Sequence, residues 1–287
     1  MKTGKMNSGM KKQPSIRNKM KELLQIDLKE IVKARGMKVP GLVLSLIEKI
    51  IHQDELNEIL RVTFPREGSE FADKVYDHLN LTLEVKGWEN VPQKGRFVFA
   101  SNHPLGGLDG IGLVNVLGAK YGDENIRVLV NDMLMNVEPL RKVFLPVNKF
   151  GAQGREATKI INEAYASDKQ IVMFPAGLVS RLHPDGEIRD LQWQKSFVAK
   201  AIESDRLIIP IRFEGLNRRR FYRLARWRRR FGIKFNIEQI FLPAEVCASK
   251  GKHFRITFLP PVDPAALKAE GKSLPEIAET IRGEIYF

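Results

Sequence analysis

Apolar residues in the first part of the chain recur at the spacing of a helix. Between residues 20 and 80 they stand mostly three or four positions apart, and Pro40 and Asp54 are typical helix starts. The apolar stripes consist of Leu23, Leu24, Ile26, Leu28, Ile31 and Val32, and then of Phe71, Val75 and Leu79. The pattern predicts a helical N-terminal region over residues 21–80. Residues 1–20 are rich in Lys, Met, Asn and Ser without periodicity, which predicts a mobile basic tail.

From Leu81 onward the pattern changes to short apolar runs that alternate with helix-like segments. The predicted strands are 81–86, 96–100, 126–130, 143–147, 170–174, 207–213 and 254–259. The predicted helices are 154–166, 191–203 and 275–285. Such alternation is typical of an α/β fold, so we expect a mixed sheet flanked by helices over residues 81–287. Pro210 lies inside one run, which predicts an edge strand or a bulge there.

Residues 217–234 combine arginine with aromatic side chains. Eight arginines lie between positions 218 and 230. On a helix the apolar side chains share a broad face that Arg228 interrupts, namely Phe221, Leu224, Ala225, Trp227 and Phe231. This pattern favours an amphipathic helix on an anionic membrane, with Arg220, Arg223, Trp227 and Arg230 as membrane-surface residues. Two alternatives stay open: nucleic-acid binding by phosphate contact and stacking, and a solvated basic face whose aromatic rings are buried.

Charge and cysteine content narrow the class of partner. The 287 residues are 43% hydrophobic, which is enough for a sizeable core. The formal net charge of +13 favours an anionic partner, such as a membrane surface, nucleic acid or an acidic carrier protein. The single cysteine, Cys247, excludes an internal disulfide and fits a reducing compartment. No apolar run is long enough to predict a transmembrane helix, so we expect a membrane contact to be peripheral.

The stretch over residues 96–110 contains the strongest candidate chemistry. A short apolar strand ends at Ala100, and His103 and Asp109 then bracket a turn that contains Gly106 and Gly107. An aspartate that orients a histidine holds the imidazole in one tautomer and stabilises its cation, so the ring can take a proton from a hydroxyl group. The alternative is that His103 lies in a loop and Asp109 caps the following helix.

Basic residues follow two further predicted strands. Lys149 and Arg155 come after the run 143–147, and Arg181 comes after the run 170–174. Because the ends of such strands converge on one crevice, we expect these cations to hold an anionic group beside His103. Individually, each could instead be a surface charge.

Other kinds of site find no support in the sequence. The remaining histidines, His52, His78, His183 and His253, are scattered, and no Cys, His or Asp cluster has the spacing of metal ligands. We therefore predict no metal site. The Gly-x-Ser-x-Gly turn of serine hydrolases and the glycine loops that bind phosphate or dinucleotides are absent.

The order of these segments resembles the glycerolipid acyltransferase superfamily, the lysophosphatidic-acid-acyltransferase-like proteins. Asn102-His103 followed by Asp109 resembles its Asn-His-x4-Asp block. Residues 144–149 resemble the second block, with Lys149 near the usual basic position, and Phe174-Pro-Ala-Gly177 resembles the Phe-Pro-Glu-Gly-Thr-Arg block. Ile208–Ile211 resembles the fourth, Val-Pro-Val-like block. The resemblance covers about residues 81–262.

Two departures from the family pattern point to one branch of it. Five residues separate His103 from Asp109 instead of four, and Ala176 replaces the expected glutamate. Both features, and the sequence of residues 101–110, resemble those of a bacterial branch often labelled hemolysin-like. Members of that branch are associated with O-acylation of lyso-aminolipids such as lyso-ornithine or lyso-glycine lipids. Loss of the glutamate disfavours a glycerol-phosphate acceptor.

The resemblance implies a fold like that of glycerol-3-phosphate acyltransferase and a lipid-biosynthetic O-acyltransferase. A fatty acyl group would move from acyl carrier protein or coenzyme A to the hydroxyl of a lyso-lipid, most simply a lyso-aminolipid. His103 would be the base and Asp109 its orienting partner. The implied substrate-binding residues are Asn102, Lys149, Arg155, Pro175, Gly177 and Arg181.

The same resemblance implies that no cofactor is needed beyond the acyl thioester co-substrate. It implies a peripheral location on the cytoplasmic face of the inner membrane, with an anionic membrane surface as partner and no nucleic acid. Two alternatives remain open for the function. One is a 1-acylglycerol-3-phosphate O-acyltransferase of phospholipid synthesis, and the other is a non-catalytic basic protein that binds membranes or nucleic acid.

Overall fold

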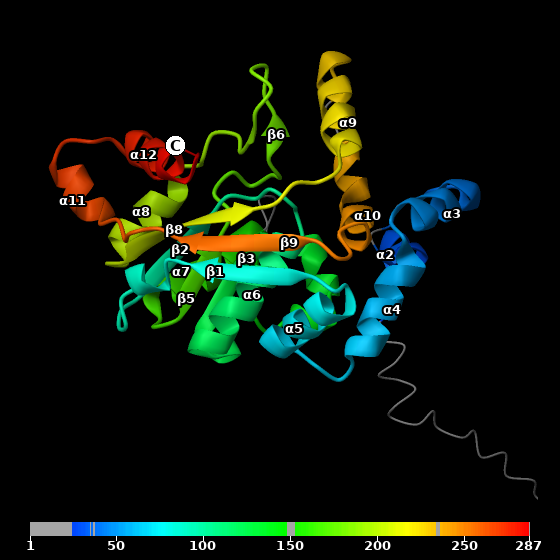
Figure 1. Ribbon diagram of the computed structural model, residues 1–287, viewed down its shortest axis with the longest axis horizontal. Coiled ribbons are helices and arrows are strands. Elements are labelled where there is room, and N and C mark those ends of the chain that lie inside the picture. Colours follow the sequence, from blue (N-terminus) through cyan, green and yellow to red (C-terminus); the bar gives the residue numbers. More distant parts are fainter. Residues whose placement is uncertain (1–24, 35, 37, 148–152, 234–235, 287) are drawn as a thin grey trace, which may run out of the picture.

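A computed structural model describes residues 25–34, 36, 38–147, 153–233 and 236–286 (Figure 1). For residues 34, 133 and 153–157 it describes the backbone only. The predicted tail over residues 1–20 lies outside the described residues.

A seven-stranded mixed sheet forms the centre of the molecule, in the order β1-β9-β8-β2-β5-β3-β4. Its strands are β1 Thr82–Lys86, β2 Phe97–Ser101, β3 Ile126–Asn131, β4 Phe144–Val147, β5 Gln170–Met173, β8 Leu207–Glu214 and β9 His253–Phe258. Neighbouring strands are parallel except β8 and β9, which pair antiparallel. All seven predicted strands are thus confirmed, and β2 occupies the middle of the sheet. A separate hairpin of β6 Arg181–Leu182 and β7 Ile188–Arg189 was not predicted.

Helices cover both faces of the sheet, as Figure 1 shows. They are α2 Leu28–Ala34, α3 Gly41–Ile50, α4 Gln53–Thr63, α5 Gly68–His78, α6 Leu108–Tyr121, α7 Gln153–Ala166, α8 Ser196–Glu203, α9 Arg219–Arg230, α10 Leu242–Cys247, α11 Pro264–Ala269 and α12 Leu274–Tyr286. Short 3-10 turns are η1 Trp88–Asn90, η2 Asp123–Asn125, η3 Asp132–Asn136, η4 Glu138–Leu140 and η5 Ile237–Phe241. The helical region predicted over residues 21–80 is confirmed for its described part, since residues 21–24 lie outside the described residues. The helices predicted over residues 154–166 and 275–285 are confirmed, whereas the one over 191–203 begins only at Ser196.

The alternation of side chains along β2 explains how this strand joins two cores. Phe97 and Phe99 face a core that includes α5 and α6, while Val98 and Ala100 face a core that includes α7, α8 and α12. Because successive side chains of a strand point to opposite faces, a strand covered on both sides must be apolar throughout. Every residue of β2 is buried. The end of β2 is therefore held rigidly at the middle of the sheet.

The edge position predicted for the strand with Pro210 is wrong. That strand, β8, lies inside the sheet between β2 and β9. The antiparallel pairing with β9 begins at Ile211 opposite Phe258, one residue past the proline. The Pro210 carbonyl accepts a hydrogen bond from the Leu259 N–H, at 2.9 Å. Antiparallel pairing resumes beyond the proline at Ile208 opposite Val262, with three residues of the partner segment opposite Ile209 and Pro210. The other predicted possibility, a bulge, agrees with this irregular register, in which a proline removes no donor of the regular ladder.

Helix α9 buries only part of the apolar face that the sequence indicated. Its buried residues are Phe221, Tyr222, Ala225 and Arg228. Trp227 and Phe231 are 51% and 61% exposed, so the alternative in which all the aromatic rings of this segment are buried does not hold. The reason is a buried acceptor: the Glu238 carboxylate of η5 binds the Arg228 Nε at 2.8 Å, which turns Arg228 inward and the two rings outward.

Candidate active site

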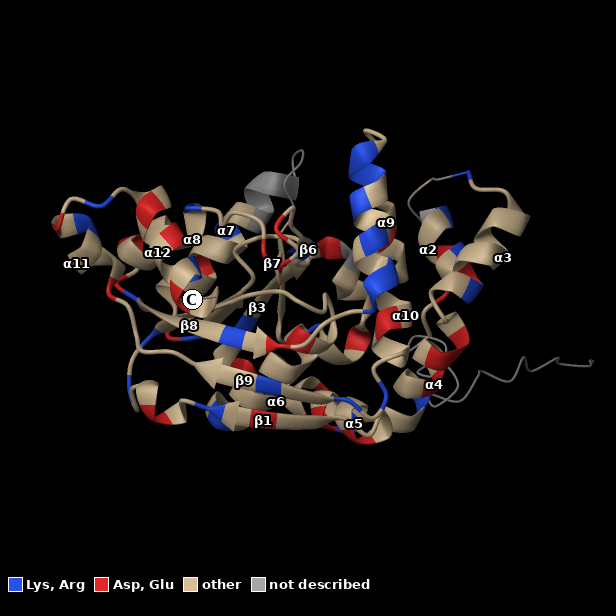
Figure 2. Ribbon diagram, turned by 45° about the horizontal axis from the view of Figure 1, so that its top comes forward, with Lys and Arg blue, Asp and Glu red and all other residues tan. Residues whose placement is uncertain are grey.

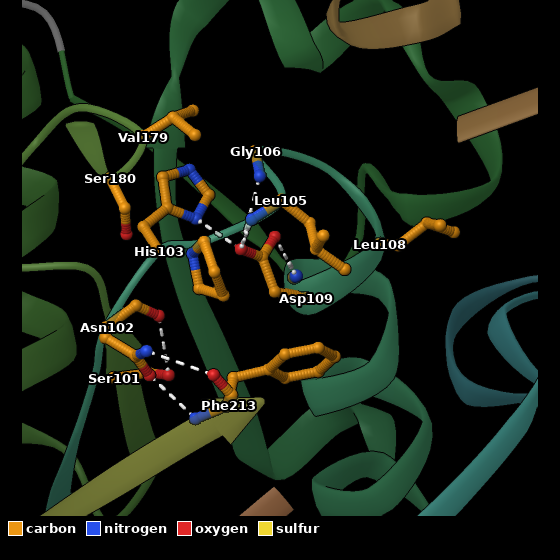
Figure 3. A network of polar contacts seen from close by, with 12 residues as sticks. Ser101, Asn102, His103, Leu105, Gly106, Leu108, Asp109, Val179, Ser180 and Phe213 are labelled. Carbon is orange, nitrogen blue, oxygen red and sulfur yellow. Dashed lines mark hydrogen bonds and ion pairs between the residues drawn. The ribbon is translucent and has the colours of Figure 1, made fainter. Parts of the chain in front are cut away.

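Asn102 and His103 follow directly on β2 and lie in a network of polar contacts (Figure 3). The Asn102 side chain is buried and pairs with the main chain of Phe213 in β8. Its Nδ2 donates to the Phe213 carbonyl at 3.0 Å, and its Oδ1 accepts from the Phe213 N–H at 2.6 Å. The amide thus continues the β2–β8 pairing beyond the end of the strand. Both its amide groups thus bind β8, and the role expected for Asn102 in substrate binding stays a prediction.

The turn between β2 and α6 brings His103 and Asp109 together, as expected from the sequence. The His103 Nδ1 lies 3.0 Å from the Asp109 Oδ2. The same oxygen accepts from the N–H groups of Leu105 at 2.9 Å and Gly106 at 3.2 Å, and Oδ1 accepts from the Gly110 N–H at 2.9 Å. Asp109 is fully buried, while the His103 side chain is 18% exposed. Asp109 therefore fixes the imidazole at Nδ1, and the ring as a whole is only partly open to solvent.

The charges of this pair support each other. Burial alone would lower the pKa of His103, but the charge and hydrogen bond of Asp109, with a contribution from the Asp190 charge, raise it above its ordinary value. Burial alone would raise the pKa of Asp109, but His103 and the N–H groups of Leu105 and Gly106 hold it below its ordinary value. The carboxylate is thus kept ionised, and it favours the tautomer of His103 that carries hydrogen on Nδ1.

Gly106 is required for the tight path of this turn. Its φ of +79° lies in the left-handed region, and a Cβ at this position would come within 2.5 Å of the Val179 side chain. Leu242 would be the next atom group met, at 2.9 Å. A side chain here would displace the turn that brings His103 to Asp109.

Phe174, at the end of β5, holds the other side of the imidazole. The two rings have centroids 4.0 Å apart and an interplanar angle of 30°. From the sequence, Phe174 was expected only to end a strand and to begin a family block. Its position one residue past a buried strand, on the neighbour of β2, is the signal that could have revealed it.

Residues 174–177 form the turn that the Pro-Ala-Gly motif predicts. The Gly177 N–H donates to the Phe174 carbonyl at 2.9 Å, and Gly177 has a φ of +65°. Pro175 and Ala176 are buried, and Ala176 belongs to the apolar core that includes Trp193 and Phe197. Pro175 and Gly177 thus shape this loop, and their predicted contact with substrate remains a proposal.

Arg181 is the clearest correction to the predicted site. We expected a free cation for an anionic headgroup, but Arg181 is 2% exposed and its Nη2 lies 2.8 Å from Glu238 Oε1. Its Nη1 donates to the Val179 carbonyl, also at 2.8 Å. A buried guanidinium needs such partners because desolvation of an unpaired charge is costly. Arg181 therefore joins β6 to η5, and headgroup binding would require these contacts to break.

The two other predicted cations cannot be placed beside His103. Lys149 lies outside the described residues. Arg155 lies in α7, and only its backbone is described. In the described part of the chain, no three His, Cys, Asp or Glu residues form a group that could hold a metal ion. The same residues include no helix that is both long and apolar enough to cross a membrane.

The geometry supports general-base chemistry. Nδ1 of His103 is occupied by Asp109, so Nε2 is the nitrogen that can take a proton from a substrate. An imidazolium formed in that step would be stabilised by the adjacent buried carboxylate. The arrangement suits activation of a hydroxyl group for attack on a carbonyl carbon.

Comparisons with known proteins agree with this chemistry. The sequence profile of a family described as acyltransferase matches residues 27–287. A lyso-glycine lipid O-acyltransferase of Phocaeicola vulgatus is 43% identical over 241 residues, which cover 83% of this chain and 86% of that protein. A lyso-glycine lipid O-acyltransferase of Bacteroides thetaiotaomicron is 39% identical over 268 residues, with 92% and 97% covered. Among solved structures, the 1-acyl-sn-glycerophosphate (LPA) acyltransferase PlsC of Thermotoga maritima has a TM-score of 0.47 at 15% identity, covering 86% of this chain and 95% of that one.

Proposed function

Since this chain belongs to the acyltransferase family, we propose that it transfers a fatty acyl group from a thioester to the hydroxyl group of a lyso-aminolipid, first of all a lyso-glycine lipid. The observation that carries the chemistry is the 3.0 Å contact between His103 and buried Asp109. The substrate class is supported by the names of the two relatives, which match over most of their lengths and of this chain.

The reaction needs only the residues described and the two substrates. His103 Nε2 takes the proton of the acceptor hydroxyl while the hydroxyl oxygen forms a bond to the thioester carbonyl carbon. The carbon–sulfur bond then breaks, and the proton passes from the imidazolium to the leaving thiolate. Asp109 stabilises the imidazolium between these steps. Because the base activates the acceptor directly, no acyl-enzyme intermediate is required.

The acyl donor is proposed to be acyl carrier protein or coenzyme A. Both are anionic, and the exposed arginines of α9 give this protein a strongly basic surface (Figure 2). Charge therefore favours both donors equally, and only an assay with each can choose between them.

The acceptor is tested with purified protein and two lyso-lipids. We expect acylation of lyso-glycine lipid with acyl carrier protein or coenzyme A as donor, and a much lower rate with 1-acylglycerol-3-phosphate. The product is measured by mass spectrometry of the extracted lipid. Acylation of 1-acylglycerol-3-phosphate alone would show that the protein is a 1-acylglycerol-3-phosphate O-acyltransferase instead. No transfer to either acceptor would contradict the proposal. In cells, loss of the protein should cause the lyso-aminolipid to accumulate.

We further propose that the protein attaches peripherally to the inner membrane on its cytoplasmic face. The outer end of α9 exposes the rings of Trp227 and Phe231, which contact each other at a tilt of 47° with their centroids 4.7 Å apart. Helix α3 exposes Leu42 by 89% and Leu46 by 58%. In Figures 1 and 2, α9 and α3 both lie in the right-hand half of the molecule, with α9 pointing upward and α3 pointing outward to the right. Anionic lipids give the cytoplasmic leaflet a negative surface potential. A basic surface with protruding apolar side chains suits such a leaflet.

The predicted membrane-surface arginines differ in how free they are. Arg223 and Arg230 are exposed on α9. Arg220 is also exposed, but its Nε lies 3.4 Å from Glu245 Oε1, which partly neutralises it. Glu245 also binds Arg218, and Glu238 binds Arg228. These two buried carboxylates fix α9 to α10 and η5. These ion pairs therefore hold the exposed part of α9 in a fixed position, in which it would contact the membrane.

Removal of the two exposed rings should weaken membrane binding. We expect the double variant Trp227→Ala, Phe231→Ala to bind vesicles that contain anionic lipid at least about tenfold less tightly, because each ring contributes about 1.5–3 kcal/mol when fully buried. Binding is measured by co-sedimentation at low and high salt. Val62→Ala, a change at a residue of α4 that is 47% exposed, is the matched control. Equal binding by the double variant and the wild type would contradict this surface.

A further inference from the structure

Asp190 is a fully buried carboxylate that the mechanism above does not use. It lies between β7 and α8, 87 residues from His103 along the chain. No motif in the sequence marks it. A buried acidic residue is retained in proteins where its oxygens are bound by donors, so its contacts show what it does.

The Asp190 carboxylate contacts three hydrogen-bond donors in the described part of the chain. Oδ1 accepts from the His103 main-chain N–H at 3.2 Å and from the Ser180 hydroxyl at 2.6 Å. Oδ2 accepts from the Trp193 indole N–H at 3.0 Å. Burial raises the pKa of Asp190 above its ordinary value, although these donors and the charge of His103 oppose the rise. The indole and the main-chain N–H can only donate, so they favour the ionised form. In that form Asp190 places a negative charge directly behind the main chain of His103.

The carboxylate joins the loops that follow two adjacent strands. His103 follows β2, Ser180 lies in the loop after β5, and the Ser180 N–H also donates to the His103 carbonyl at 2.8 Å. The main chain of Asp190 is itself held by α12. Its N–H donates to the Tyr286 hydroxyl at 2.9 Å, and its carbonyl accepts from Arg282 at 3.0 Å. The position of His103 is thereby tied to the C-terminal helix.

We propose that Asp190 is a positioning residue for acyl transfer: it fixes His103 against the 175–181 loop, and its charge stabilises the imidazolium that forms when His103 takes the acceptor proton. The predicted effect of Asp190 on the rate of acyl transfer rests on the proposed function. Its predicted effect on the pKa of His103 does not, and that pKa can be measured without substrate.

Three charged groups face His103 from the elements around it. They are Asp109 of α6, Asp190, and Arg181 of β6. The phenols of Tyr76 and Tyr222 lie near Asp109, and burial raises the pKa of both, so they stay neutral at physiological pH. The two carboxylates raise the pKa of His103, and Arg181 lowers it. Removal of the Asp190 charge should therefore lower the pKa of His103.

The test is Asp190→Asn, which keeps the shape and removes the charge. We expect kcat to fall about 10- to 100-fold with KM little changed, since a displaced base affects the chemical step more than binding. The acid limb of the pH–rate profile should move to lower pH, because a neutral His103 is needed and its pKa has fallen. Titration of the His103 ring by NMR should show the same shift, with His103→Gln used to assign its signal.

Asp185→Asn is the matched control, because Asp185 is an exposed aspartate of the β6–β7 hairpin. It should leave the rate and the ring titration unchanged. If Asp190→Asn fails to fold, Ser180→Ala and Trp193→Phe each remove one donor to the carboxylate and should each lower kcat. An unchanged His103 pKa in folded Asp190→Asn, or unchanged kcat in both donor variants, would overturn the inference. Wild-type protein that acylates no lyso-lipid would overturn the proposed function instead, while the NMR titration would still decide the role of Asp190.

Discussion

Replacing His103 with alanine is expected to lower the rate of acyl transfer by about 10²–10⁴-fold, the usual contribution of a positioned general base. The acceptor hydroxyl then has no group to take its proton as the oxygen attacks. The fold should be retained, because the His103 side chain is not part of either large apolar core and its main-chain contacts to Ser180 and Asp190 remain. The rate is measured with lyso-glycine lipid and the better thioester donor.

Membrane binding provides the control for this variant. The proposed membrane surface lies on α3 and α9 and does not include His103, so vesicle binding should equal that of the wild type. Thermal unfolding checks that the fold is intact. Unimpaired acyl transfer by His103→Ala would remove the mechanism, whatever the acceptor proves to be.

The second large effect is expected for Asp109→Asn, with a loss of about 10²–10⁴-fold in kcat. The two carboxylate oxygens accept from four donors: the His103 ring and the N–H groups of Leu105, Gly106 and Gly110. An asparagine must turn its NH₂ group toward at least one of these donors, and it carries no charge. His103 then loses both its fixed tautomer and the stabilisation of its cation.

The pH dependence of the rate should also change in a definite direction. Wild-type kcat/KM should fall as pH falls through the pKa of His103, which Asp109 and Asp190 hold above its ordinary value of 6.5 against the opposing effect of burial. In Asp109→Asn the acid limb should move to lower pH, because the pKa of His103 falls when the carboxylate charge is lost. Asp263→Asn is a suitable control, since Asp263 caps α11 through one side-chain oxygen that asparagine also supplies. An acid limb at the wild-type pH in Asp109→Asn would contradict the pairing.

Local features of the sequence were sufficient for most secondary structure. The strand β2 is apolar at four successive positions after a turn, and such a run has few alternatives to a buried strand. Pro210 misled because the rule against proline inside a sheet concerns donors in the ladder, and where the β8–β9 ladder ends depends on β9, more than forty residues later. The buried face of α9 could not be read from the sequence, because Arg228 lies inward only through its ion pair with Glu238.

What the sequence by itself determined is the α/β class and the His103–Asp109 pair. Both follow from short-range features. Strand and helix periodicity predicts the fold class, and the short glycine turn between His103 and Asp109 predicts that their side chains lie close together. Only the tertiary structure decided that Arg181 pairs with Glu238 and Asn102 with β8. It also decided that Phe174 covers one side of the imidazole and that Asp190 lies behind His103. The physical reason is that the partner of a buried charge or amide is chosen by strand order and helix packing, and these bring together residues that are far apart in the chain.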